Sequence, residues 1–355
     1  MRLPTRPSNQ YVASAVIAFV ATLSAFALPA DAKVSGTNGQ IVFARFEKAL
    51  NDSVIYAVNP NGSGLERLSP GNLGGAEGPR WSPDGSSVAF SSTPPVAAVI
   101  ADVDTRTFRL LPMQEPATLL TFCSAWTPDG ARLACDSFGL TDPSLNGIYS
   151  IRSSDGGDLT KVISNPGGLD TSLCDYSPDG SNFAMVPTHA DGSSELDTVN
   201  LSTGVVKQLA PAGTTLRDFQ CGSWSPEGDQ ILFAARPAQG HRRALYVVNS
   251  DGTGLRQVPI SPSCGGAASD STSRGCQNPG WSPDGTKIVF HIFAPGIHLN
   301  NTIFTANADG TGLFQVTHAG AIDSTAETKS PSCALRACVR EGDTVPDWGT
   351  HPVTG

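Results

Sequence analysis

The sequence lacks any run of basic residues, and it carries 23 Lys and Arg against 32 Asp and Glu. Because nucleic-acid phosphates are met by Lys and Arg, this balance argues against a nucleic-acid partner. After residue 32, the sequence also lacks an apolar run approaching the about 20 residues that a membrane-spanning helix needs. No Cys-x-x-Cys pair occurs, which disfavours a zinc site. We therefore expect a soluble, acidic protein.

The first 32 residues have the features of a signal peptide. Arg2 and Arg6 give a positive start, Val12 to Leu28 is almost wholly apolar, and Ala30-Asp31-Ala32 is a small-x-small cleavage pattern. An uncleaved membrane anchor is the alternative, but the apolar run is short for one. No cysteine follows this run closely, which disfavours a lipoprotein anchor. Cleavage after Ala32 would leave a secreted or periplasmic protein with a net charge of about −10.

The predicted mature chain contains all eight cysteines: Cys123, Cys135, Cys174, Cys221, Cys264, Cys276, Cys333 and Cys338. An even number of cysteines in an exported protein points to disulfides rather than to catalytic thiols. Cys264 and Cys276 bracket a stretch rich in Gly, Ser and Asp, and Cys333 and Cys338 bracket Ala-Leu-Arg-Ala. We predict that each of these two pairs is bonded. The other four cysteines leave three pairings open.

One five-residue motif recurs along the chain. Its copies are Trp81-Ser-Pro-Asp-Gly85, Trp126-Thr-Pro-Asp-Gly130, Tyr176-Ser-Pro-Asp-Gly180, Trp224-Ser-Pro-Glu-Gly228 and Trp281-Ser-Pro-Asp-Gly285. They are spaced by 45, 50, 48 and 57 residues. A period in this range is typical of the blades of a β-propeller.

Each residue type in the motif has a role in a β-turn. Pro fixes φ, Asp bonds the backbone downstream, and Gly adopts the positive φ that closes the turn. An apolar strand follows each turn, so the aromatic residue and this strand should form a hairpin whose aromatic side chain is buried. The predicted turn residues are Asp84, Gly85, Asp129, Gly130, Asp179, Gly180, Gly228, Asp284 and Gly285.

A second hairpin follows in most repeats. Asp-Gly, a tight-turn signal, separates alternating strands at residues 155–156, 251–252 and 309–310. Two hairpins per repeat make a four-stranded antiparallel sheet, which is one propeller blade.

The two ends of the chain should share a blade. Gly39 to Phe43 matches the strand after the motif, but no motif precedes it, and an orphan copy stands at Val345-Pro-Asp-Trp348. We expect the C-terminal strand to complete the first blade, because ring closure removes exposed sheet edges. The fold prediction is thus an all-β, six-bladed propeller over residues 33–355.

The repeats resemble those of the TolB-type propeller family, often described as WD-repeat-like. The resemblance covers residues 39–349 and concerns the fold more than any activity. TolB also has an α/β domain before its propeller, and only about six residues separate the predicted cleavage site from the first strand here. We therefore expect the propeller without that domain.

Several patterns raise the question of a metal or an enzyme. The Asp-Gly-Thr-Gly sequences at 251–254 and 309–312 lack the alternating oxygen ligands of a calcium loop, so we interpret them as turns. The resemblance extends to propeller lyases that hold a metal through several histidines. The histidines here do not recur at one repeat position: His189, His241, His291, His298, His318 and His351. We predict no cofactor and no metal.

The longest segments between strands should lie on one face of the propeller. They cover residues 136–147, 187–195, 235–243, 260–279 and 319–345. Such loops often carry binding residues, although they can also be tolerated insertions. We expect a monomeric, non-catalytic binding or scaffold protein whose protein or glycan partner contacts this face. The alternative is a propeller enzyme, either a metal-dependent oligosaccharide lyase or a hydrolase with a site at the channel mouth. A hydrolase with a following α/β domain is disfavoured, because no Gly-x-Ser-x-Gly motif occurs.

Overall fold

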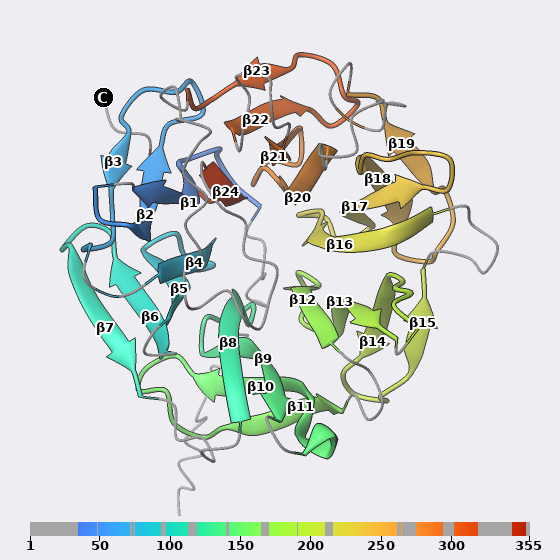
Figure 1. The fold of residues 1–355 in the computed structure, drawn as a ribbon, viewed down its shortest axis with the longest axis horizontal. Coiled ribbons are helices and arrows are strands. Elements are labelled where there is room, and N and C mark those ends of the chain that lie inside the picture. The colour runs from blue at the N-terminus through green and yellow to red at the C-terminus, as the bar shows by residue number, and fades with distance from the viewer. Residues whose placement is uncertain are drawn as a thin grey trace, which may run out of the picture.

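Six four-stranded antiparallel sheets are arranged around a central axis, as Figure 1 shows. The computed structural model describes residues 35–47, 49–71, 73, 75–93, 97–112, 119–139, 142–164, 170–189, 191–209, 216–260, 264, 275–293, 302–318 and 343–352. The prediction of a six-bladed propeller is confirmed. The predicted signal peptide lies outside the described residues.

The blades are numbered along the chain, and their strands are given from the axis outward. Blade one contains β24 (Asp343–Trp348), β1 (Ile41–Glu47), β2 (Asp52–Val58) and β3 (Glu66–Arg67). Blade two contains β4 (Gly75–Trp81), β5 (Ser87–Thr93), β6 (Ala97–Asp102) and β7 (Thr107–Leu111). Blade three contains β8 (Leu119–Trp126), β9 (Arg132–Gly139), β10 (Gly147–Arg152) and β11 (Thr160–Ser164), with the short helix η1 (Pro143–Leu145) before β10.

The second half of the ring follows the same plan. Blade four contains β12 (Asp170–Tyr176), β13 (Asn182–Thr188), β14 (Asp197–Asn200) and β15 (Val206–Gln208). Blade five contains β16 (Leu216–Trp224), β17 (Gln230–Pro237), β18 (Ala244–Asn249) and β19 (Arg256–Val258). Blade six contains β20 (Gly275–Trp281), β21 (Lys287–Phe293), β22 (Thr302–Asn307) and β23 (Phe314–Gln315).

The second strand of each blade is apolar on both faces because each face packs against a neighbouring blade. In β1, Ile41 and Phe43 pack towards blade six, whereas Val42 packs towards blade two. All three side chains are fully buried. The same arrangement around the ring gives a cluster of buried apolar side chains at each of the six blade boundaries. This double burial explains why the strands after the turn motif read as continuous apolar runs.

The ring is closed by the pairing of β1 with β24. Ile41 lies opposite Trp348 in this antiparallel pair, and the indole N–H of Trp348 donates to the carbonyl of Gly39 at 2.9 Å. The two ends of the chain therefore form one sheet, as the orphan motif at Trp348 predicted. β24 thus takes the innermost place in blade one that β4, β8, β12, β16 and β20 take in the other blades.

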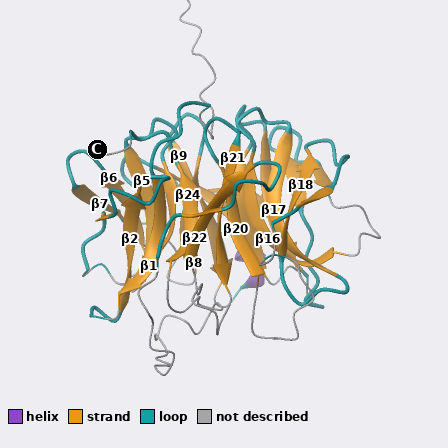
Figure 2. Cartoon of the chain, turned by 90° about the horizontal axis from the view of Figure 1, so that it is seen from above, coloured by secondary structure: helices purple, strands orange, loops and turns teal. Residues whose placement is uncertain are grey.

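The connections divide into two faces. The turn face carries the Pro-Asp-Gly turns and the Asp-Gly turns, which join the first strand to the second and the third to the fourth within a blade. The opposite face, which we call the long-loop face, carries two kinds of connection. One kind joins the second strand of a blade to the third and includes η1, and the other kind joins one blade to the next. Figure 2 shows the strands running between these faces, with η1 at the lower one. No helix among the residues that the structure describes is long and apolar enough to cross a membrane.

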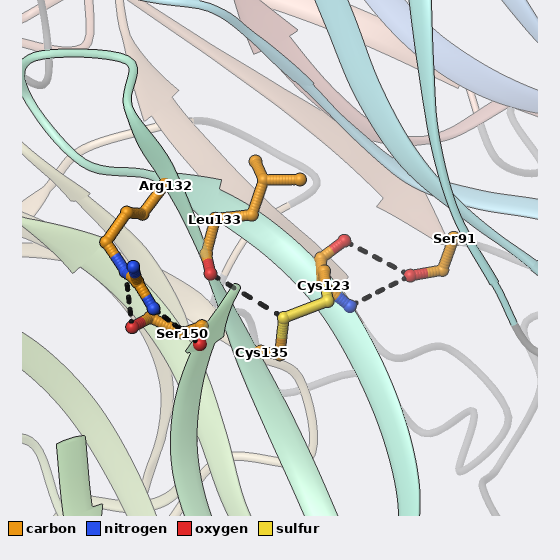
Figure 3. Close-up of a disulfide and its surroundings, with 6 residues drawn as sticks. All are labelled: Ser91, Cys123, Arg132, Leu133, Cys135 and Ser150. Carbon is orange, nitrogen blue, oxygen red and sulfur yellow. Dashed lines mark hydrogen bonds between the residues drawn. A yellow bond between two sulfur atoms is a disulfide. The ribbon is translucent and has the colours of Figure 1, made fainter. Parts of the chain in front are cut away.

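Disulfides join the six described cysteines. Cys123–Cys135 links β8 to β9 within blade three, Cys174–Cys221 links blade four to blade five, and Cys264–Cys276 joins the segment before blade six to β20. Beside the first of these, Ser91 Oγ donates to the Cys123 carbonyl and accepts from its N–H, both at 3.1 Å (Figure 3). Cys333 and Cys338 lie outside the described residues. Three disulfides indicate an oxidising, extracytoplasmic environment.

Candidate functional site

The repeated turn motif has the same geometry in every blade that carries it. The five motif glycines have φ between 67° and 73°, a region that side chains other than Gly rarely adopt. In blade four, Asp179 accepts hydrogen bonds from Ser177 Oγ at 2.6 Å and from the Ser181 N–H at 3.0 Å. The bond from Ser177 lowers the pKa of Asp179. The carboxylates of the motif aspartates therefore already accept hydrogen bonds within their own turns.

Blade five makes the same hydroxyl–carboxylate hydrogen bond with a different acidic residue. Its motif has Glu227 where the other copies have Asp, and Glu227 is exposed. Here Ser225 Oγ donates to Asp229 at 2.8 Å, two residues further along. The hydroxyl–carboxylate hydrogen bond is therefore present in both turns, although the residue that supplies the carboxylate differs in its position along the sequence.

The motif aromatic residues form a buried ring between blades, with exposed fractions from 1% to 6% for Trp81, Trp126, Tyr176, Trp224, Trp281 and Trp348. Two indoles donate across a blade boundary at 3.2 Å, Trp126 to the carbonyl of Arg80 and Trp224 to the carbonyl of Asp175. At Trp81, the backbone N–H instead donates to Asp347 at 2.8 Å. These residues join blades and have no exposed ring face for a ligand.

The central channel is narrow at the turn face. A cavity of about 30 Å³ lies there, lined by Arg80, Asp175, Asp347 and neighbouring motif residues. At roughly 10–15 Å³ for each water, this space holds about two water molecules. It is too small for an organic ligand.

A wider groove of about 670 Å³ lies between blades four and five on the turn face. Its wall combines Asp179 and Glu227 with Lys207, together with the amide side chains of Asn182 and Asn200. Charges of both signs are present, without a marked excess of either sign. This groove therefore offers no strong preference for one class of ligand.

On the long-loop face, the backbone at Arg243 is docked on the first residues of β20. Arg243 forms a parallel bridge with Gly275, and the Cys276 N–H donates to the Arg243 carbonyl at 3.1 Å. Gly275 has φ of 78°, and a Cβ there would lie 2.4 Å from the Arg243 carbonyl oxygen. Cys276 is also bonded to Cys264. The disulfide and the glycine thus fix the backbone position of Arg243.

The Arg243 guanidinium joins blade five to blade six. It donates to the Asp218 carboxylate at 2.6 Å and to the Asp218 carbonyl at 3.1 Å, and its other amino group donates to Gln277 Oε1 at 3.1 Å. Arg236 Nε lies 2.8 Å from the second carboxylate oxygen of Asp218. Asp218 lies at an irregular point of β16 and has φ of 54°. One carboxylate is therefore held between two guanidinium groups.

Two buried polar side chains beside this arginine have nitrogen atoms without hydrogen-bond partners. Gln277 and His291 lie directly opposite each other on β20 and β21, with exposed fractions of 2% and 0%. Neither Gln277 Nε2 nor either ring nitrogen of His291 has a partner. Burial, aided by the positive charge of Arg243, lowers the pKa of His291 to about 3. The imidazole is therefore neutral at pH 7.

The described side chains at this place carry an excess of positive charge. Arg217, Arg236, Arg242 and Arg243 stand on neighbouring segments of blade five, and Asp218 is the described carboxylate that contacts two of them. The chain as a whole has a net charge of −9. We call the group of Asp218, Arg236, Arg243, Gln277 and His291 the blade five–six cluster.

A second titratable group lies on the long-loop side of blade four. Asp197 is 5% exposed, and its Oδ1 has no partner. Burial, with the nearby charge of Glu195, raises the pKa of Asp197 to about 7. Glu195 accepts from Gln208, and its carboxylate lies 3.1 Å from His189 Nε2.

The histidines are dispersed over the ring. His189 contacts Glu195, His351 Nδ1 lies 3.0 Å from the Gly85 carbonyl, His241 and His318 are exposed, His291 is buried, and His298 lies outside the described residues. Within the described ranges, no three His, Cys, Asp or Glu side chains are grouped as ligands for a metal ion.

Sequence reasoning did not identify the blade five–six cluster. One signal was present at the position after the apolar strand triplet. From blade one to blade six this position is Ala44, Ser91, Asp136, Val186, Ala234 and His291. Ser91 bonds the next blade, so this position faces a neighbouring blade. Asp136 and His291 are the ionisable residues at this position, and His291 is the one whose ring nitrogens have no partner. The partners Arg243 and Gln277 belong to parts of the chain that have no repeat, so their approach had no signal.

Comparison with known proteins gives similarity of fold. No model of a known protein family matches the sequence, and no curated protein matches it. Among solved structures, TolB from Acinetobacter baumannii matches with a TM-score of 0.63 at 18% identity, over 88% of this chain and 66% of that chain. The chain thus spans just under two thirds of that protein.

Two further structures are similar. A putative TolB from Agrobacterium tumefaciens matches with a TM-score of 0.56 at 18% identity, over 79% of this chain and 90% of that one. Oligogalacturonate lyase from Vibrio parahaemolyticus matches with a TM-score of 0.52 at 12% identity, over 76% and 72% of the two chains. At these identities the likeness concerns the fold alone. The chain is structurally similar to TolB β-propellers and to other six-bladed propellers.

Proposed function

We propose that this chain is an exported, non-catalytic binding propeller whose long-loop face contacts a protein or glycan partner at blades five and six. The observation that carries this proposal is the blade five–six cluster. It places arginine side chains and unpartnered polar groups beside the Cys264–Cys276 disulfide, in a protein of net charge −9. Buried polar groups without partners are rare in folded proteins and call for an explanation.

The turn face supports a structural role better than a binding role. Its repeated aspartates bond their own turns, and its aromatic ring is buried. A partner could gain little from side chains whose bonds are already made. On the long-loop face, the unpaired buried groups in blades five and six include an ionisable ring, His291, and stand beside arginine side chains. The unpaired buried groups at the turn-face end, in Gln40, Trp81 and Trp281, are neutral and lie inside the packed ring.

Site-specific photo-crosslinking tests the choice of face. A photoreactive amino acid is placed at exposed Gln239 or His241 on the long-loop face, and at exposed Glu227 or Asp284 on the turn face. The protein is then incubated with an extract of the source cells, and a glycan array is probed in parallel. We expect cross-links, or loss of glycan binding, from the long-loop positions only. Cross-links confined to the turn-face positions would refute the proposal.

A further inference from the structure

The blade five–six cluster is rich in hydrogen-bond donors. Arg243 has five N–H groups, and Asp218 and Gln277 accept three hydrogen bonds from them. Gln277 Nε2 adds two N–H donors without a partner. The neutral His291 ring adds one more N–H, together with one nitrogen that can accept.

An oxyanion is the ligand class that such a set accommodates best. Its oxygens accept several N–H bonds at once, and its charge is complementary to the excess of arginine. An apolar ligand would leave the donors unsatisfied, at a cost in free energy for each. A cation would be repelled by Arg236 and Arg243.

The protein already holds one carboxylate in this way. Asp218 is bound by Arg243 at 2.6 Å, and its other oxygen is approached by Arg236 at 2.8 Å. Each guanidinium contacts the Asp218 carboxylate with one nitrogen, and two of the five N–H groups of Arg243 make no hydrogen bond to Asp218 or Gln277. The Arg243 and Arg236 side chains are 13% and 28% exposed, so the cluster reaches solvent at this end.

The cluster is also held rigidly. Arg243 is docked by its backbone on Gly275 and Cys276, and Cys276 is fixed by its disulfide. Gln277 and His291 are held opposite each other by the pairing of β20 with β21. Rigid donors lose little conformational entropy when a ligand binds.

We propose that Arg243, Gln277 and His291 form a binding site for a small oxyanion, a carboxylate or phosphate group carried by the ligand. The inference rests on the proposed function in one respect: this group belongs to the partner of the long-loop face. Binding of the free anion can be measured without that partner.

The test is the thermal unfolding midpoint of the full chain in acetate, in phosphate and in chloride at matched ionic strength and pH 7. A ligand that binds only the folded state raises the midpoint in a saturable way. We expect such a rise with acetate or phosphate above chloride. A rise with acetate alone identifies a carboxylate, and a rise with phosphate alone identifies a phosphate. Absence of a saturable rise with both anions would overturn the proposal.

Two variants assign the effect to the cluster. Arg243→Gln should raise the apparent Kd at least tenfold, whereas Arg256→Gln, on the exposed outer strand of the same blade, should leave it unchanged. If Arg243→Gln does not fold, as circular dichroism would show, Gln277→Glu replaces an amide donor with a carboxylate of the same size. It should also abolish the rise. Unchanged binding in a folded variant of either kind would overturn the assignment.

The outcomes separate this inference from the proposed function. Cross-links from the long-loop face without anion binding would refute the oxyanion site and leave the function standing. Anion binding lost in Arg243→Gln, together with cross-links from the turn face only, would refute the proposed function and leave the site standing.

Discussion

The turn face and the blade five–six cluster use polar residues in opposite ways. On the turn face, the same hydroxyl–carboxylate bond recurs, from Ser82 to Asp84 and from Ser282 to Asp284. In the cluster, Gln277 and His291 occur once and keep nitrogens without partners. The repeated hydroxyl–carboxylate pairs are satisfied within their own turns. The unpaired nitrogens of Gln277 and His291 are available to a ligand, and this contrast locates the candidate site.

The largest expected effect belongs to the aromatic ring. Trp224 is 2% exposed and donates to the Asp175 carbonyl across the boundary between blades four and five. Trp224→Ala should lower the free energy of unfolding by about 3–5 kcal/mol, because it leaves a cavity between blades. Urea unfolding followed by circular dichroism measures this change. Val206→Ala, at a side chain that is 52% exposed, is the control. A loss at Trp224 as small as that at Val206 would contradict the packing role.

The next effect concerns pH and Asp197. The folded-state pKa of Asp197 is raised to about 7 from its ordinary value of 3.8, so this group contributes stability that is present below pH 3.8. That stability is lost as pH rises towards 7, at up to about 1.4 kcal/mol for each pH unit. Asp197→Asn should remove this negative contribution, so that the slope of the free energy of unfolding against pH, measured between pH 4 and pH 7, becomes more positive than in wild type.

Asp191 provides the matched control. It is exposed in the same connection, and its hydrogen bond from Ser193 lowers its pKa rather than raising it. Asp191→Asn should therefore leave the slope between pH 4 and pH 7 in place. Equal slopes in wild type and in Asp197→Asn would show that Asp197 does not titrate in this range.

The smallest expected change in the free energy of unfolding tests the turns whose hydrogen bonds are already made. Asp179→Ala removes the acceptor for Ser177 and for the Ser181 N–H, and should lower the free energy of unfolding by about 1–2 kcal/mol. Glu227→Ala, at the corresponding position of blade five, should change it by less than about 0.5 kcal/mol, because Asp229 makes the bond there. Equal losses at the two positions would mean that the carboxylate contact does not stabilise the turn.

The fold could be predicted from the sequence because each blade repeats the same local sequence pattern of turn motif and apolar strand. The spacing of the motif gave the blade length, and the orphan copy at Trp348 gave the closure with Ile41. The pairing of Cys174 with Cys221 could not be predicted, because it depends on how two blades face each other. Cys264–Cys276, which brackets one excursion, could be proposed from spacing and is present in the structure.

The blade five–six cluster was beyond sequence reasoning for a related reason. Asp218, Arg243 and Gln277 come from three connections or strand ends, and neither a period nor a motif links them. Their contact arises from the docking of Arg243 on Gly275, which is a property of the folded ring. Within the cluster, His291 was recognisable as an ionisable residue in an apolar strand, although Asp136 stands at the same position of blade three.

The central claim is that His291 is retained for a ligand and not for stability, and His291→Leu tests it most directly. The folded-state pKa of His291 is lowered to about 3 from 6.5, so its contribution to stability is present above pH 6.5 and is lost as pH falls towards 3. In wild type this slope opposes that of Asp197 below pH 6.5. Thermal unfolding of wild type and variant, with and without the stabilising anion, measures stability and binding together. The account predicts that His291→Leu is at least as stable as wild type at pH 5 and shows no anion-induced rise. A lower midpoint combined with an undiminished rise would contradict it.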